Sequence, residues 1–134
     1  MQPAAPIIVA VIGGQVVGVA LDSGQIVWRY AMEGAIAPPR IHVTAHHVFV
    51  AGPVLACLDY RTGGVYWHVA APKRHNHPGT MLVQDGRLLF GLEDTLFCHA
   101  ISDGRLLWHC PLPAKGWEQI ALGAPGNVAQ ADGR

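Results

Sequence analysis

The sequence predicts an all-β fold in which about three β-propeller blades, each a sheet of four antiparallel strands, follow one another along the chain. Trp28, Trp67 and Trp108 recur at intervals of 39 and 41 residues, and a period near 40 residues is typical of propeller blades. Runs of β-branched and aromatic residues alternate with Gly, Asp and Ser, and no stretch of ten residues has helical periodicity. A glycine precedes each tryptophan by four residues: Gly24, Gly63 and Gly104.

The third repeat illustrates the strands predicted for each blade. Strands are expected at 80–83, 88–92, 95–101 and 105–110, because these segments are rich in leucine, aromatic and β-branched residues. Short polar turns separate them, and the glycine of Asp85-Gly86 tolerates the positive φ of a two-residue hairpin.

Alignment on the tryptophans brings the three repeats into register without gaps, within a single predicted domain of residues 1–134. The first blade is expected to have only three strands, at 7–30, because few residues precede it. The second blade spans about 36–70 and the third about 80–110. Residues 120–134 are predicted to contribute one further strand.

This C-terminal strand is predicted to complete a blade of another copy of the chain. Residues 127–134 resemble residues 80–87, since both read as a strand followed by an Asp-Gly-Arg turn, and the first blade lacks such a strand. The residues expected at the junction are Asn127, Val128, Ala129 and Gln130 from one chain, and Ile7, Ile8 and Val9 from the other.

A six-bladed ring formed by two chains is the predicted assembly. Three blades are too few for a closed ring, since known propellers have about four to eight. Two head-to-tail junctions would bury roughly 2,000–5,000 Å², the area of an obligate interface. A head-to-tail contact can also close at other copy numbers or continue as a filament.

The residues around the tryptophans resemble the propeller repeat of the pyrroloquinoline-quinone (PQQ) type, whose motif runs approximately A-x-D-x-x-T-G-x-x-x-W. The second repeat matches it best, with Asp59, Thr62, Gly63 and Trp67, and with Cys57 in place of the alanine. The first and third repeats carry shortened versions. The resemblance implies that each tryptophan packs against the neighbouring blade, where an indole would bury about 150–250 Å².

The same resemblance raises the alternative of a quinoprotein-like enzyme that binds PQQ and Ca²⁺ in a central channel. Such enzymes are expected to use a catalytic Asp and, often, a disulfide between adjacent cysteines. No two of Cys57, Cys98 and Cys110 are adjacent, and most aspartates lie in predicted turns, whereas Ca²⁺ needs several oxygen ligands. We therefore predict a non-enzymatic chain with no catalytic residue and no cofactor.

Composition restricts the partners and the location. The formal net charge is +0 and the basic residues are scattered, which disfavours nucleic acid. Neither a signal peptide nor an apolar run long enough for a membrane span is evident. An odd number of cysteines indicates free thiols in a reducing compartment, so we expect a cytoplasmic or virion location. The charged fraction of only 13% indicates burial between chains.

Two further features are weaker candidates for binding. His75 and His77 form a His-x-His in a loop, but a transition metal needs three or four ligands, so polar loop residues are the favoured interpretation. Trp117 lies outside the repeats and is interpreted either as packing for the C-terminal strand or as an anchor for another protein.

Taken together, these features favour a non-catalytic, self-assembling propeller. It would act as a protein-binding scaffold or as a structural part of a larger complex or particle, for example as a virion accessory. Its predicted partners are a second copy of itself and another protein that the sequence does not identify. A ligand- or cofactor-binding propeller that uses its central channel is the alternative.

Overall fold

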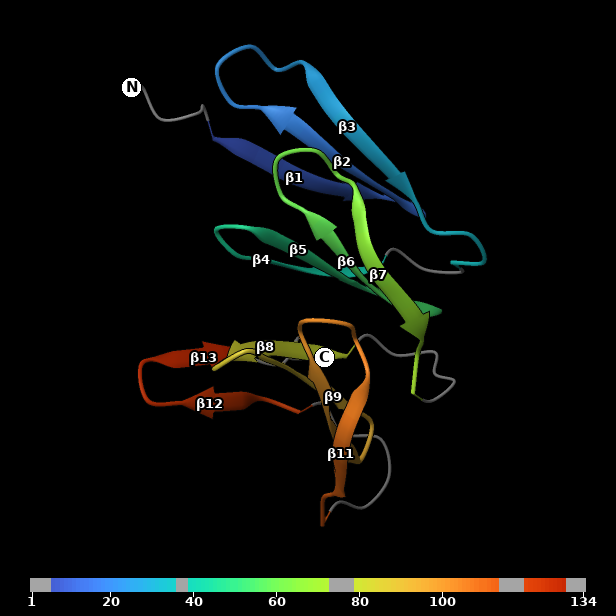
Figure 1. Cartoon of the computed structure of the whole chain (residues 1–134), viewed down its shortest axis with the longest axis vertical. Helices are drawn as coiled ribbons and strands as arrows, with labels where there is room; N and C mark the ends of the chain where they lie inside the picture. Colours follow the sequence, from blue (N-terminus) through green and yellow to red (C-terminus); the bar gives the residue numbers. More distant parts are fainter. Residues whose placement is uncertain (1–5, 36–38, 73–78, 114–119, 130–134) are drawn as a thin grey trace.

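The computed structural model describes residues 6–35, 39–72, 79–113 and 120–129, and in these ranges the chain forms β-strands and no helix. Three sheets stack one after another as propeller blades, with a small two-stranded sheet beside the last (Figure 1). The predicted all-β, bladed architecture is confirmed, whereas the ring of two chains stays a prediction. Nothing in the described ranges qualifies as a helix that could cross a membrane.

Blade 1 has three strands, and blades 2 and 3 have four each. Blade 1 comprises β1 (Ile7–Ile12), β2 (Gln15–Ala20) and β3 (Ile26–Ala31). Blade 2 comprises β4 (Arg40–Val43), β5 (His47–Ala51), β6 (Val54–Asp59) and β7 (Val65–Ala70). Blade 3 comprises β8 (Thr80–Gln84), β9 (Arg87–Leu92), β10 (Thr95–Ala100) and β11 (Leu106–Pro111).

Strands that follow one another in the chain are also neighbours in each sheet, so every blade is an antiparallel meander. Within the described residues β1 pairs only with β2, which leaves β1 as an edge strand. A register shift follows Gly18 in β2, Cys57 in β6 and Cys98 in β10, each directly opposite the tryptophan of its blade. The bulge therefore recurs with the repeat.

One detail of the ungapped repeat alignment is corrected by the strand registers. Ala51 pairs with Leu55 in blade 2, whereas Leu92 pairs with Thr95 in blade 3, so the connection in blade 2 is longer by one residue. The longer connection contains Pro53, which cannot donate a backbone hydrogen bond. The alignment thus holds from β6 to the tryptophan, but the preceding strand β5 is displaced by one position.

The apolar core lies between the blades, because each sheet presents one face to each neighbour. In β5, Val48 and Val50 pack towards blade 1, while Phe49 and Ala51 pack towards blade 3. All four are buried, which explains why this strand reads as a continuous apolar run. Among the described residues, the face of blade 1 that points away from blade 2 has no such cover, and Ile8 and Ile12 on it are exposed.

The C-terminal segment differs from the single strand predicted at 120–134. It forms a hairpin of β12 (Leu122–Ala124) and β13 (Asn127–Ala129), which lies against β8 of blade 3 (Figure 1). Pro125 and Gly126 make the turn, because proline presets φ at the first turn position and Gly126 adopts a φ of +73° at the second. The turn predicted at Asp132-Gly133 lies outside the described residues.

Candidate functional site

The first two tryptophans each donate the indole N–H to the backbone of the next blade. Nε1 of Trp28 lies 2.9 Å from the carbonyl oxygen of Tyr60, and Nε1 of Trp67 lies 2.6 Å from that of Ile101. Both indole rings are buried, and the N–H group of each has a hydrogen-bond acceptor. The accepting carbonyls belong to the docking turns, which we define as residues 20–24, 59–63 and 100–104.

A glycine in the docking turn makes room for the ring. A Cβ added to Gly63 would lie 2.6 Å from the ring of Trp28, and one added to Gly104 would lie 2.4 Å from the ring of Trp67. Both glycines also have positive φ, which disfavours any other residue. The Gly-x-x-x-Trp spacing in the sequence therefore does not mark a contact within one repeat. Each glycine receives the tryptophan of the preceding blade.

The same backbone hydrogen bonds shape the docking turn in all three blades. The glycine N–H donates to the carbonyl four residues earlier, at 2.8 Å in each case: Gly24 to Ala20, Gly63 to Asp59 and Gly104 to Ala100. A second N–H, three residues before the glycine, donates to the carbonyl just before β1, β5 or β9: Leu21 to Pro6, Tyr60 to His46 and Ile101 to Gly86. The docking turn of blade 1 thus has the form of the other two.

At each end of the three-blade stack, one partner of the tryptophan contact is present without the other. Trp108 in β11 is 44% exposed, against 6% for Trp28 and 8% for Trp67. At the other end, a Cβ added to Gly24 would meet nothing within 4 Å, and Leu21 is 56% exposed. Among the described residues, blade 3 therefore presents a free tryptophan and blade 1 a free docking turn.

Carboxylates hold the docking turns of blades 2 and 3. Asp59 accepts a hydrogen bond from the Tyr66 hydroxyl at 2.5 Å and from the N–H groups of Arg61 and Thr62. The bond from Tyr66 is the main reason that the pKa of Asp59 lies below its usual value. Asp103 has a lowered pKa chiefly because it accepts the N–H of Arg105. Asp103 is exposed and Asp59 is half-buried, and both positions suit a role in turn geometry.

His99 is a buried titratable group that sequence reasoning missed. It takes the place that Leu58 holds in blade 2, and only 2% of it is exposed. Its Nδ1 lies 2.9 Å from the carbonyl oxygen of Gly104, so Nδ1 carries the proton, and Nε2 is buried without a partner among the described residues. Burial lowers the pKa of His99. A histidine within an apolar strand was the only signal available in the sequence.

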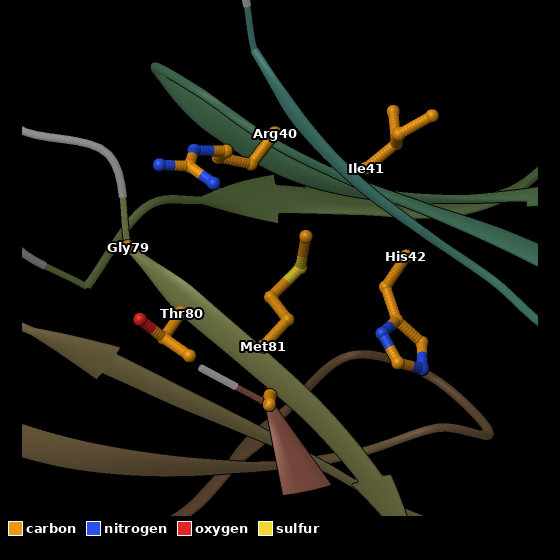
Figure 2. Close-up of a pocket in the computed structure, with 7 residues that line it drawn as sticks. Arg40, Ile41, His42, Gly79, Thr80 and Met81 are labelled. Carbon is orange, nitrogen blue, oxygen red and sulfur yellow. The ribbon is translucent and has the colours of Figure 1, made fainter. Parts of the chain in front are cut away.

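A small hollow lies where β4 and β8 meet the C-terminal hairpin. Its lining residues include Arg40, His42, Thr80 and Met81, and Figure 2 shows the Met81 side chain between Arg40 and Thr80 on one side and His42 on the other. Burial lowers the pKa of His42, which favours the neutral imidazole. The volume of about 180 Å³ is below the roughly 300–1,000 Å³ of typical ligand pockets.

Four predicted candidates lie outside the described residues: His75, His77, Trp117 and Gln130. In the parts of the chain that the structure describes, no group of three His, Cys, Asp or Glu side chains is placed to hold a metal ion. The three cysteines are free, as predicted: Cys57, Cys98 and Cys110.

On the β1 side of the predicted junction between copies, part of the backbone is already paired. The Tyr60 hydroxyl accepts the N–H of Ile7 at 2.6 Å and donates to its carbonyl oxygen at 2.9 Å. A strand added to this edge would displace Tyr60 or pair from Val9 onward, because alternate residues share an edge. The exposed side chain of Ile8 remains accessible there.

On the other side of that junction, β13 is anchored within its own chain. Nδ2 of Asn127 donates to the carbonyl oxygen of Val83 at 2.7 Å and to Oε1 of Gln84 at 3.0 Å. Val128 is exposed, and Ala129 lines the hollow. The pairing of β13 with β1 of another copy stays a prediction.

Comparison with known proteins extends these observations. The family model PQQ_2, whose description is "outer membrane protein assembly factor BamB", matches residues 13–129. This range contains all three tryptophan motifs. No curated protein matches the chain.

Several solved structures share the fold. BamB from Moraxella catarrhalis is 20% identical with a TM-score of 0.60, covering 75% of this chain and 33% of that one. Quinohemoprotein alcohol dehydrogenase from Comamonas testosteroni is 15% identical with a TM-score of 0.61, and the match covers 84% of this chain and 21% of that one. The computationally designed Ika4 protein is 14% identical with a TM-score of 0.69, covering 96% and 81%. The chain thus spans a third or less of the two natural proteins, and these identities concern the fold alone.

The family model covers most of the chain, and the structural neighbours include PQQ-type quinoprotein propellers. The matched range includes both tryptophan contacts that join one blade to the next. The chain therefore belongs to the PQQ_2 family of β-propeller repeat proteins.

Proposed function

We propose that this chain is a non-catalytic propeller whose function is to bind protein through the faces that its terminal blades leave open. One observation carries the proposal. Ile8 and Ile12 of β1 are 50% and 74% exposed, whereas Leu88 and Leu92, at the matching positions of β9, are each 1% exposed. The same apolar positions are thus covered by a neighbouring blade in one place and open in the other.

Trp108 makes the corresponding case at the opposite end of the stack. It is the counterpart of two buried tryptophans, yet 44% of it is exposed. Gathered apolar side chains of this kind are typical of surfaces that contact another protein, and tryptophan is favoured at the centre of such contacts. A scaffold in a larger complex, in the cytoplasm or in a virion, is the finer form of this proposal.

A cofactor-binding propeller is the alternative, and the hollow beside β4 supports it weakly because of its small volume. A titration of the purified protein with PQQ and Ca²⁺ tests this alternative, with quinone absorbance and dye-linked alcohol oxidation as readouts. We expect no saturable binding and no activity. Saturable binding accompanied by turnover would overturn the non-catalytic assignment.

Site-specific photo-crosslinking tests the protein-binding role. A photoreactive amino acid at Ile12, on the open face of blade 1, is compared with the same group at Arg61, an exposed position in blade 2, which has a neighbour on each face. We expect crosslinks to protein from position 12, in cells or with the purified chain, and few from position 61. Equal yields at the two positions, or none at either, would contradict the proposal.

A further inference from the structure

We propose that Trp108 of one copy binds the docking turn of blade 1 in a second copy, so that two chains join head to tail. The inference rests on the proposed function, because it names the partner that covers the open faces. Its contact has a definite form. Nε1 of Trp108 would donate to the carbonyl oxygen of Leu21, and the indole ring would lie over Gly24.

The chain itself contains this contact twice. Trp28 and Trp67 each donate to a carbonyl three residues before the glycine that receives the ring, namely Tyr60 before Gly63 and Ile101 before Gly104. Leu21 stands three residues before Gly24 in the same way. Donor, acceptor and ring space for a third contact are therefore all present, on opposite ends of one chain.

The docking turn of blade 1 is already in its binding form. Gly24 has a φ of +74°, against +73° for Gly63 and +78° for Gly104, and its N–H makes the same backbone bond. The space over Gly24 is open. Because the backbone is preorganised, docking would cost little ordering of the turn.

The surfaces around the contact are apolar on both sides. On blade 1 the open face carries Ile8 and Ile12. On blade 3 the half-buried Leu89 and Leu96 stand where blade 2 has Phe49 and Leu55, which are fully buried against blade 3. The new junction would thus continue the packing seen between the existing blades. The C-terminal hairpin lies against β8, at the edge of blade 3 away from β11 (Figure 1). Ile120, just before the hairpin, lies over Gly91 of β9, while Trp108 in β11 is 44% exposed.

A second copy is the occupant that uses both open halves. Blade 3 of each chain would dock on blade 1 of the other, so two identical junctions close the assembly with no half left over. Two chains of three blades give six blades, within the four to eight of known rings. A different protein could cover either open half, whereas a copy of this chain already carries the residues that cover both.

Solution mass by light scattering tests the inference directly. We expect wild type to have the mass of two chains. Trp108→Ala should raise the dissociation constant of the dimer about 30-fold or more, as expected for a central tryptophan. Trp108→Phe, which keeps a ring but loses the N–H, serves as a second variant that disturbs folding less. A single-chain mass for wild type, or a Trp108→Ala variant as dimeric as wild type, would overturn the inference.

The glycine supplies a matched pair of variants. Gly24→Ala places a methyl group where the ring must lie and should weaken the dimer about tenfold or more. Gly86→Ala carries the same cost of positive φ, +75°, but has open space and no tryptophan to receive. It should leave the dimer intact. Equal effects from both variants would contradict docking at Gly24.

Mixing distinguishes head-to-tail docking from any symmetric stacking of Trp108 on Trp108. Trp108→Ala keeps its docking turn and Gly24→Ala keeps its tryptophan, so a mixture of the two can form one intact junction. We expect the mixture to dimerise more tightly than either variant alone. No gain on mixing would sink the head-to-tail arrangement. The broader protein-binding role would then still stand if Ile12 crosslinks to another protein.

Discussion

At the scale of residues, the contact between tryptophan and glycine joins one blade to the next. Trp28 reaches Tyr60 and Gly63, which lie more than thirty residues further along the chain. The ring fills the space that a side chain at residue 63 would need, so the two identities constrain each other.

Replacement of Gly63 by alanine should therefore be costly. The added methyl group would overlap the Trp28 ring, and the positive φ adds strain, so we expect a loss of about 2–4 kcal/mol in the free energy of unfolding. Urea denaturation measures it. Gly86→Ala, strained but unobstructed, is the control and should lose only about 1–2 kcal/mol. Similar losses for both variants would mean that the ring contact contributes little.

His99 predicts a dependence of stability on pH. Burial lowers its pKa below the ordinary 6.5, so the unfolded chain binds the proton more readily than the folded chain. The contribution of neutral His99 to the free energy of unfolding is therefore fully present above pH 6.5. It is lost as the pH drops below this value, by up to about 1.4 kcal/mol per pH unit.

His99→Leu, which introduces the residue of blade 2, should remove this contribution. His42 has a lowered pKa for the same reason, so only the difference between wild type and variant isolates His99. Urea midpoints between pH 5 and pH 8 provide the measurement. Parallel pH profiles for the two proteins would refute the assignment.

At the scale of elements, the strands of blades 2 and 3 follow the sequence prediction closely, while the C-terminal segment does not. Strands in the blades recur in two or three aligned copies, and the Gly and Asp residues between them act as turn signals. After residue 120 the described chain forms only the short strands β12 and β13, which lie against β8. Tertiary contact thus decides a hairpin that local pattern left undetermined.

Asn127 is predicted to be the main polar anchor of this hairpin. Asn127→Ala removes both hydrogen bonds to β8, and we expect amide exchange in β12 and β13 to accelerate about tenfold, while exchange in β9 and β10 stays unchanged. Val128→Ala, at an exposed position, serves as the control. Unaltered exchange in the Asn127 variant would show that apolar contact alone holds the hairpin.

At the scale of the whole molecule, stability is distributed over the interfaces between blades. Two separate apolar clusters join blade 1 to blade 2 and blade 2 to blade 3. Stacked repeats of this kind gain stability from each neighbour contact and can unfold in parts.

Trp28→Ala should accordingly uncouple blade 1. Loss of the buried indole costs about 3–5 kcal/mol at that interface, so β1–β3 should exchange and unfold at lower urea than β8–β11. Hydrogen exchange followed at several urea concentrations separates the two regions. A single cooperative transition lowered for all strands alike would argue against unfolding in parts.

The sequence by itself determined the blade count, the strands of each blade and the PQQ-type family, because the repeat reports each strand two or three times. Its period could not say which tryptophan meets which glycine, since contact between blades depends on how the sheets stack. The hairpin at 122–129, the buried position of His99 and the open state of Trp108 were decided only by the tertiary structure. Each depends on which surface lies opposite, and a linear pattern does not encode that neighbour.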